Sequence, residues 1–309
     1  MIATLESIDL HTWISILIKT TTYATALVAA GSVLVSLSIR SFSTDMRRWL
    51  GRVAAMSATA AATFSVARLP VRASFLTGGS LDGALDPMML NMVAESPLGT
   101  SIGIRLFGLA LILAILLPVR GGRWVAAIGS VIVCASFAFR GHVLEPPRVL
   151  LGGLLTAHLL ALAYWIGALA PLLRTAFREP PSIAGAAAQE FGEKAIWIVG
   201  ALVAAGAAML LLFGLSNLAA FETPYGQAIA FKILLFVGVL SLAAANKLRL
   251  TSALLHAKPN AANHLRRSVH VEAVLIAAIL LTTAAFTTVS SPARDKAEQS
   301  RTNAATDRS

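Results

Sequence analysis

The sequence predicts an all-α protein, a polytopic bundle of about eight transmembrane helices with both termini outside. The first observation is composition: 57% of the 309 residues are hydrophobic and 13% are charged, whereas a soluble domain carries roughly 25% charged residues. The second is that apolar residues gather in stretches of about 20, the length that crosses a bilayer as a helix. The third is that prolines, glycines and basic residues fall between those stretches, where connections are expected.

Eight stretches are long enough to span a membrane. We expect spans at residues 13–39, 48–68, 102–119, 122–140, 149–173, 193–217, 227–247 and 268–289. Chain breakers separate them, among them Pro70, Gly121 and the pair Pro180 and Pro181. Short connections make neighbouring helices antiparallel, and the many Ala, Gly and Ser residues within the spans favour close helix packing in lipid.

Two segments are expected outside the bilayer. Residues 69–101 form the longest predicted loop, in which Asp86 can cap a short helix, Pro87 suits its first turn and Pro97 ends it. Residues 291–309 are polar with mixed charge, which predicts a disordered tail. The chain therefore divides into one membrane domain, residues 1–290, and this tail.

The basic residues between the spans predict the orientation. Fourteen Lys and Arg residues lie on one side, and nine lie on the other, four of them in the tail. The positive-inside rule places the richer side in the cytoplasm. Both termini and His142 then lie on the periplasmic side of a bacterial inner membrane. Because these charges act as orientation signals, the net charge of +10 predicts no nucleic-acid partner. The first ten residues contain no Lys or Arg, so we expect no cleaved signal peptide.

Two histidines are the leading candidates for chemistry. His142 directly follows the fourth span, and His158 lies about nine residues into the fifth, roughly 14 Å below its start. An imidazole in an apolar span is costly unless it is paired, hydrated or bound to a ligand. Neutral imidazole binds copper, zinc, iron and nickel. The alternatives are a hydrated interfacial residue for His142 and a helix-to-helix hydrogen bond for His158.

Three methionines in the outer loop are a second candidate. Met88, Met89 and Met92 have spacings that place them on one face of the predicted short helix. Thioethers are soft ligands that suit Cu(I). The alternative is that these side chains only pack or touch the membrane surface.

Other polar residues in the spans have predicted structural roles. Lys19 and Lys232 are expected to reach the headgroups or to pair with a carboxylate such as Glu145 or Glu222. A second group lies on the cytoplasmic side, where it is expected to hold helices together. It consists of Glu272, Asn246 and Arg249.

The sequence lacks the motifs of several common functional classes. The single cysteine, Cys134, excludes a disulfide framework and a CxxC site. The sequence contains no phosphate-binding loop, no phosphorylated-aspartate motif and no protease pattern. We therefore predict neither an enzyme nor an ATP-driven pump.

The second half of the chain resembles a known family. The run His158-Leu-Leu-Ala-Leu-Ala-Tyr-Trp-Ile-Gly-Ala-Leu is similar to the His-Leu-Leu-Ala-x-x-x-Trp-x-Gly-Gly-Leu signature of the copper resistance protein D (CopD) family. The pair Gly141-His142 resembles that family's Gly-His element. Further similar elements follow in order, at Tyr225-Gly226, Lys232, residues 245–250 and residues 265–272. The matches run from about residue 140 to residue 290.

This resemblance implies an eight-helix inner-membrane protein that handles copper beside a periplasmic copper-binding partner of the CopC type. It implies His142 and His158 as the metal-contacting positions. Family members often carry a histidine in the first helix after a basic residue, whereas here Thr20 follows Lys19. Ala168 also replaces a glycine that is usual in the signature. The sequence shows no CopC-like domain, so such a partner would be a separate chain.

The leading hypothesis is movement of copper from the periplasm into the cytoplasm through His142 and His158, fed by Met88, Met89 and Met92. Further inward, the sequence offers only the scattered Met56, Met209 and Cys134 as soft ligands. A haem-binding electron carrier is the first alternative, and it needs two histidines at matching depth on facing helices. A copper-sensing scaffold that transports nothing is the second.

Overall fold

The computed structural model describes residues 9–119, 121–144, 146–213, 224–246 and 261–289, and these residues form helices with no strand. Eight of the helices described are long and apolar enough to cross a membrane, which confirms the predicted all-α bundle of about eight spans. They are α2 (Leu10–Ser38), α3 (Thr44–Leu76), α6 (Pro97–Ile112) with η1 (Leu113–Leu116), α7 (Gly122–Ala135) with η2 (Ser136–Phe139), α8 (Arg148–Arg178), α9 (Pro181–Leu212), α10 (Pro224–Ala245) and α12 (Ala261–Val289).

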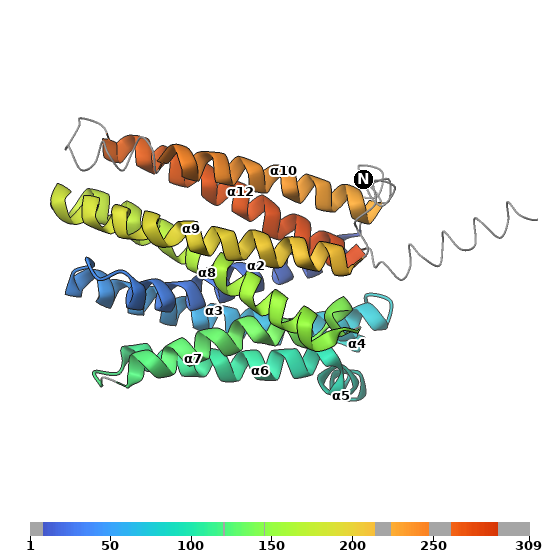
Figure 1. Cartoon of the computed structure of the whole chain (residues 1–309). Helices are drawn as coiled ribbons and strands as arrows, with labels where there is room; N and C mark the ends of the chain where they lie inside the picture. Colours follow the sequence, from blue (N-terminus) through green and yellow to red (C-terminus); the bar gives the residue numbers. More distant parts are fainter. Residues whose placement is uncertain (1–8, 120, 145, 214–223, 247–260, 290–309) are drawn as a thin grey trace, which may run out of the picture.

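The helices run side by side, with α10 and α12 at one edge of the bundle and α6 and α7 at the other (Figure 1). The short helices α4 (Leu81–Leu85) and α5 (Pro87–Glu95) lie at one end, together with η3 (Gly141–Leu144) and the start of α8. We call this the α5 end. The opposite end holds the α2–α3 connection and the α8–α9 connection, and we call it the Glu190 end.

Helix boundaries follow local sequence signals, with one exception. The Asp86 carboxylate accepts from the backbone N–H groups of Met88 and Met89 at 2.7 and 3.3 Å, so the predicted cap of α5 is confirmed. The predicted break at Pro70 is wrong, because α3 continues through it to Leu76. Proline loses one backbone hydrogen bond, a loss that neighbouring helices make tolerable within a membrane bundle.

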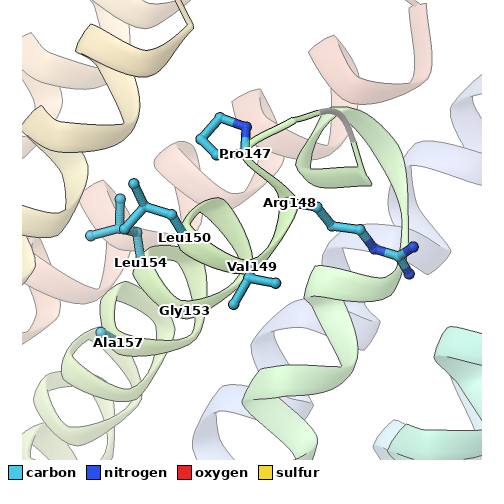
Figure 2. Close-up of a pocket in the computed structure, with 7 residues that line it drawn as sticks. All are labelled: Pro147, Arg148, Val149, Leu150, Gly153, Leu154 and Ala157. Atoms are coloured by element: carbon cyan, nitrogen blue, oxygen red, sulfur yellow. The ribbon is translucent and has the colours of Figure 1, made fainter.

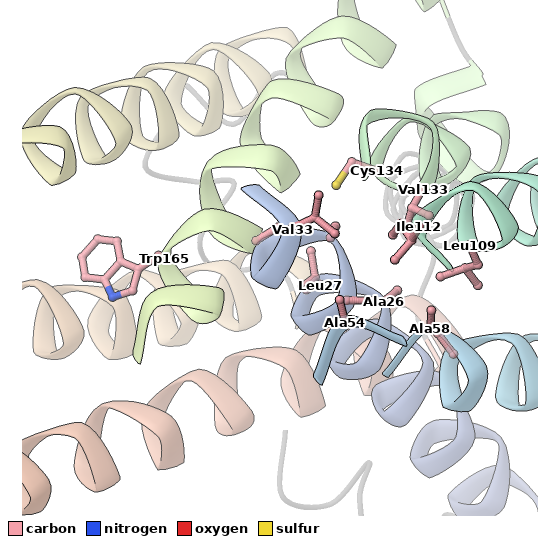
Figure 3. Packing of buried hydrophobic residues seen from close by; sticks show 14 of the residues in the cluster. Ala26, Leu27, Val33, Ala54, Ala58, Leu109, Ile112, Val133, Cys134 and Trp165 are labelled. Carbon is pink, nitrogen blue, oxygen red and sulfur yellow. The ribbon is translucent and has the colours of Figure 1, made fainter. Parts of the chain in front are cut away.

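Helix α2 is at the centre of the bundle and is the most buried of the eight spans. Figure 3 shows its core residues Leu27 and Val33 between α8 on one side and α6 and α7 on the other. The α2–α8 crossing is unusually close: a Cβ added at Gly31 would lie 1.9 Å from the carbonyl oxygen of Ala163, and one at Gly167 would lie 2.3 Å from the Gly31 carbonyl carbon. Only glycine fits at either position, as expected for close packing in lipid.

Hydrogen bonds fasten the helices together at the Glu190 end. The Glu190 carboxylate of α9 accepts from the backbone N–H groups of Arg40 and Ser41 at 2.9 and 3.2 Å, and from the Lys194 ammonium at 2.8 Å. The Arg47 guanidinium donates to backbone carbonyls at the end of α2, including that of Ile39 at 2.8 Å. The Arg47 bonds satisfy carbonyl groups that the end of α2 leaves free, and the Glu190 bonds hold the α2–α3 connection against α9.

The other half of the bundle is packed less closely. Helix α9 packs against α8, and α10 packs against α12, while α12 also contacts α2 and α8. Helices α9 and α10 are the least buried of the eight spans. Their outer faces carry large apolar side chains, such as Trp197 at 81% exposure, which suits contact with lipid tails.

Candidate metal site

His158 lies inside the bundle, where a single hydrogen bond determines which ring nitrogen is available. It follows the first residue of α8 by ten positions, which is about 15 Å along the helix. Its Nδ1 lies 3.0 Å from the carbonyl oxygen of Leu202 on α9. A carbonyl can only accept, so Nδ1 carries the proton and donates. The lone pair is then on Nε2, the form of imidazole that binds a metal.

The surroundings of His158 come from three helices. On α9, Gly206 makes room for the ring, since a Cβ there would lie 3.4 Å from His158 Cε1. On α10, Lys232 interacts electrostatically with His158. The predicted helix-to-helix bond and a lone pair suited to a metal are therefore both present at this one residue. The nearby ammonium of Lys232 opposes a bound cation, which favours weak or transient binding over permanent retention.

A mostly apolar cavity with a carboxyl group in its wall lies further along the same face of α8, toward the Glu190 end. Trp165 follows His158 by seven residues, which is two helical turns. It lines a cavity of about 370 Å³ between α8, α9, α10 and α12. Glu272, only 2% exposed, is a wall of this cavity. It accepts hydrogen bonds from the Asn246 amide and from the Trp165 side chain.

Sequence reasoning underestimated Glu272. The predicted pairing of Asn246 with Glu272 is confirmed, and Arg249 lies outside the described residues. What it missed is that this carboxyl group faces a cavity. The available signal was an acidic residue inside an apolar span, which is costly and commonly functional.

The structure places His142 apart from His158. His142 is the second residue of η3, next to Gly141, whose φ of +74° lies in the region that favours glycine. The His142 side chain lies outside what the structure describes. Its backbone is at the α5 end, whereas His158 is about 15 Å along α8. The two positions therefore differ in depth along α8.

A surface hollow near the start of α8 carries no ligating group. Apolar side chains such as Leu150 and Leu154 line it, and Arg148 points away from them (Figure 2). It approaches His158 only through Ala157. This hollow is better suited to a lipid chain than to a metal ion.

The three methionines are on α5, separate from the two histidines. Met88 is 80% exposed and Met92 is 49% exposed, and they lie one turn apart on the outer side of the helix. Met89 is half-buried. Helix α5 packs against α3, α4 and α6. Within the part of the chain that the structure describes, no group of three His, Cys, Asp or Glu side chains is arranged to hold a metal ion.

A bundle of eight apolar helices, with a histidine and a carboxyl group along one internal face, defines a multi-pass membrane protein with polar positions between its helices. Comparison with known families identifies the family within this class. Residues 8–145 match the model described as copper resistance protein D-like, N-terminal domain, and residues 185–286 match the model described as copper resistance protein D. No curated protein and no solved structure matches the chain.

The chain belongs to the copper resistance protein D family and is a membrane protein of copper resistance. The two matches together span more than three quarters of its length. The sequence resemblance was limited to the second half, whereas the N-terminal match extends over the first half as well. His142 lies within the first match, and Lys232, Asn246 and Glu272 lie within the second. His158 lies between them.

Proposed function

We propose that this protein moves copper across the membrane along the inner face of α8, with His158 as the first internal ligand and the Glu272 cavity as the next position. The observation that carries the proposal is the bond from His158 Nδ1 to the Leu202 carbonyl, which leaves the Nε2 lone pair inside the bundle. Trp165 and Glu272 continue the polar line two turns further on. Inward of His158 the sequence offers only scattered soft ligands, and Glu272 supplies a polar group at that depth.

Direction rests on the basic residues. Those at the Glu190 end outnumber those at the α5 end, which supports a cytoplasmic Glu190 end in the bacterial inner membrane. Copper then enters at the α5 end, near His142, and leaves through the cavity side. Copper is the substrate in this scheme, and no bond of the protein or of a substrate is made or broken, so no enzymatic role is proposed.

A copper-binding protein of the CopC type would deliver the metal at the α5 end. The exposed thioethers of Met88 and Met92 offer a soft-ligand surface there, with half-buried Met89 beside them. Copper accumulation at limiting copper, compared between cells with and without such a partner, tests this role. Equal accumulation in the two would remove the partner from the scheme.

The alternatives have less support. A haem carrier needs a second histidine facing His158 at its depth. Among the other histidines of the described residues, His11, His142 and His264 lie within the first four residues of their helices, and His270 is exposed on α12. A copper-sensing scaffold needs no internal route, and the Glu272 cavity therefore favours transport over sensing.

The decisive experiment measures cell-associated copper in four strains: without the protein, with the wild type, with His158→Ala and with His270→Ala. His270 is the matched control, because its Nδ1 also bonds a backbone carbonyl, that of Arg266, but its ring is exposed. We expect the wild type and His270→Ala to accumulate copper, and His158→Ala to fall to the level of cells without the protein. The same copper content in all four strains would end the transport proposal.

A further inference from the structure

Buried side-chain polar atoms without a hydrogen-bond partner are rare in folded proteins and call for an explanation. The described part of the chain has four: Ser65 Oγ and one Nη1 atom on each of Arg68, Arg105 and Arg140. Arg140 interacts electrostatically with both Arg68 and Arg105, and Arg68 also interacts with Arg105. Ser65 lies three residues before Arg68, on the same side of α3. All four atoms therefore belong to one region.

The region is buried in the α5 half of the bundle. Arg105 is fully buried, and Arg68 is 9% exposed. Each lies eight residues from the end of its helix, Arg68 from Leu76 and Arg105 from Pro97, which is about 12 Å along the axis. The two guanidinium groups are thus at matching depth, on neighbouring helices that pack together.

Arg105 is held in a fixed orientation. Its Nε donates to Ser136 Oγ at 3.1 Å, and its Nη2 donates to Ser101 Oγ at 3.0 Å. Its guanidinium carbon lies 4.0 Å from the centre of the Phe137 ring. These contacts come from α6 and η2 and leave Nη1 as the one nitrogen without a partner. A polar group this well positioned is typical of a binding site.

Positive charge accumulates around this point. Lys19 on α2 is 3% exposed, donates to the Thr288 hydroxyl at 3.2 Å and interacts electrostatically with Arg68 and Arg140. The ion pairs found between described residues, Arg48 with Asp45 and Lys194 with Glu190, are at the Glu190 end. No carboxylate of the described residues pairs with the buried cations. Like charges in an apolar interior repel strongly unless an anion lies among them.

We propose that Arg68, Arg105 and Arg140 bind a phosphate group within the α5 half of the bundle. The free donors come from three segments, α3, α6 and the residue after η2, so the anion must accept from several directions. A phosphate offers more oxygen acceptors than a carboxylate and is the usual partner of clustered guanidinium groups. The phosphate belongs either to a lipid headgroup or to a soluble molecule. The site differs from the copper route in both position and charge.

The experiment uses the purified, metal-free, full-length protein, so its result does not depend on copper transport. The midpoint of thermal unfolding is followed as inorganic phosphate replaces chloride at constant ionic strength. A ligand that binds only the folded state raises the midpoint. We expect this rise for the wild type and for Arg52→Met, which changes an exposed arginine of α3. We expect no rise for Arg68→Met or Arg105→Met.

A second measurement identifies the source of the phosphate. Native mass spectrometry of protein purified with its lipids reports any phospholipid that remains bound. Lipid retained by the wild type and lost from Arg68→Met identifies a headgroup, whereas a phosphate response without retained lipid identifies a soluble ligand. Either result supports the site.

Two outcomes overturn the proposal. In the first, the wild type shows neither a phosphate response nor a retained lipid, so water satisfies the buried nitrogens. In the second, Glu145→Gln gains a phosphate response that the wild type lacks, so the chain's own carboxylate is the partner. If an Arg→Met variant does not fold, Arg105→Lys replaces it. This change keeps the charge but removes the planar fork, and it is expected to weaken the response.

Discussion

The histidine at position 158 and the glutamate at position 272 show how much one hydrogen bond changes the chemistry of a buried residue. His158 donates from Nδ1 to a backbone carbonyl, which leaves the ring's lone pair on Nε2. Glu272 accepts from Asn246 and Trp165, yet it still faces a cavity. Each residue is thus held by its neighbours, and in the proposed route each would contact a passing copper ion.

Replacing Glu272 with glutamine separates its transport role from its structural one. The Glu272→Gln side chain keeps the size and an oxygen for Trp165, but it loses the carboxylate that would bind copper. We expect copper accumulation to fall toward the level of cells without the protein. We expect thermal stability to change little, because the lower cost of burying an uncharged amide is offset by the loss of one of the two acceptor oxygens that serve Asn246 and Trp165.

Glu193→Gln is the matched control, because Glu193 is exposed on α9. It should change neither copper accumulation nor stability. Copper accumulation by Glu272→Gln at the wild-type level would mean that Glu272 only holds helices together, which is the role that the sequence predicts for it.

At the scale of elements, the close crossing of α2 and α8 positions the candidate site. Gly31 and Gly167 allow the two backbones to touch. Gly167 is two residues from Trp165, so the separation of the helices here affects where the Trp165 ring meets Glu272. The site therefore depends on glycines that carry no chemistry of their own.

Gly167→Ala should destabilise the protein by about 1–3 kcal/mol, the usual cost of overpacking. The added methyl group would lie 2.3 Å from the Gly31 carbonyl carbon and force α2 and α8 apart. Thermal unfolding of the purified protein measures the effect. Gly153→Ala is the control, because nothing lies within 4 Å of a Cβ at that position of α8. Equal stability of the two variants would show that the crossing is looser than described.

The sequence predicts the helices far better than it predicts the contacts between residues of different helices. Apolar length determines the eight spans, and Asp86 and Pro87 determine the start of α5, because these are local effects. Pro70 misled the prediction, since a proline ends a helix in water but not in a packed membrane bundle. The bond between His158 and Leu202 joins residues 44 positions apart. No local pattern encodes that separation, so the tautomer of His158 required the structure.

At the scale of the whole molecule, the orientation in the membrane would decide the direction of the proposed transport. The one cysteine, Cys134, is fully buried, so cysteines introduced at exposed sites report their side of the membrane against a silent background. Met88→Cys at the α5 end should react with a membrane-impermeant thiol reagent in intact cells. Arg178→Cys at the Glu190 end should react only after the membrane is opened.

The two cysteine positions differ only in the side of the membrane on which they are expected to lie. Met88 and Arg178 are both exposed, so neither is protected by the protein itself. Labelling of Arg178→Cys in intact cells, with Met88→Cys protected, would reverse the orientation. It would turn the proposed import into export.

The uneven packing of the bundle has a consequence for how a route could open. Helices α2, α3, α6, α7 and α8 form a closely packed block, whereas α9 contacts this block mainly through α8, and α10 packs against α12, which itself contacts α2 and α8. The His158–Leu202 and Trp165–Glu272 bonds both cross from this block to the looser helices. Alternating access would therefore use the block as a fixed frame and rock α9, α10 and α12 against it. In that motion these two hydrogen bonds would break when the path opens and form again when it closes.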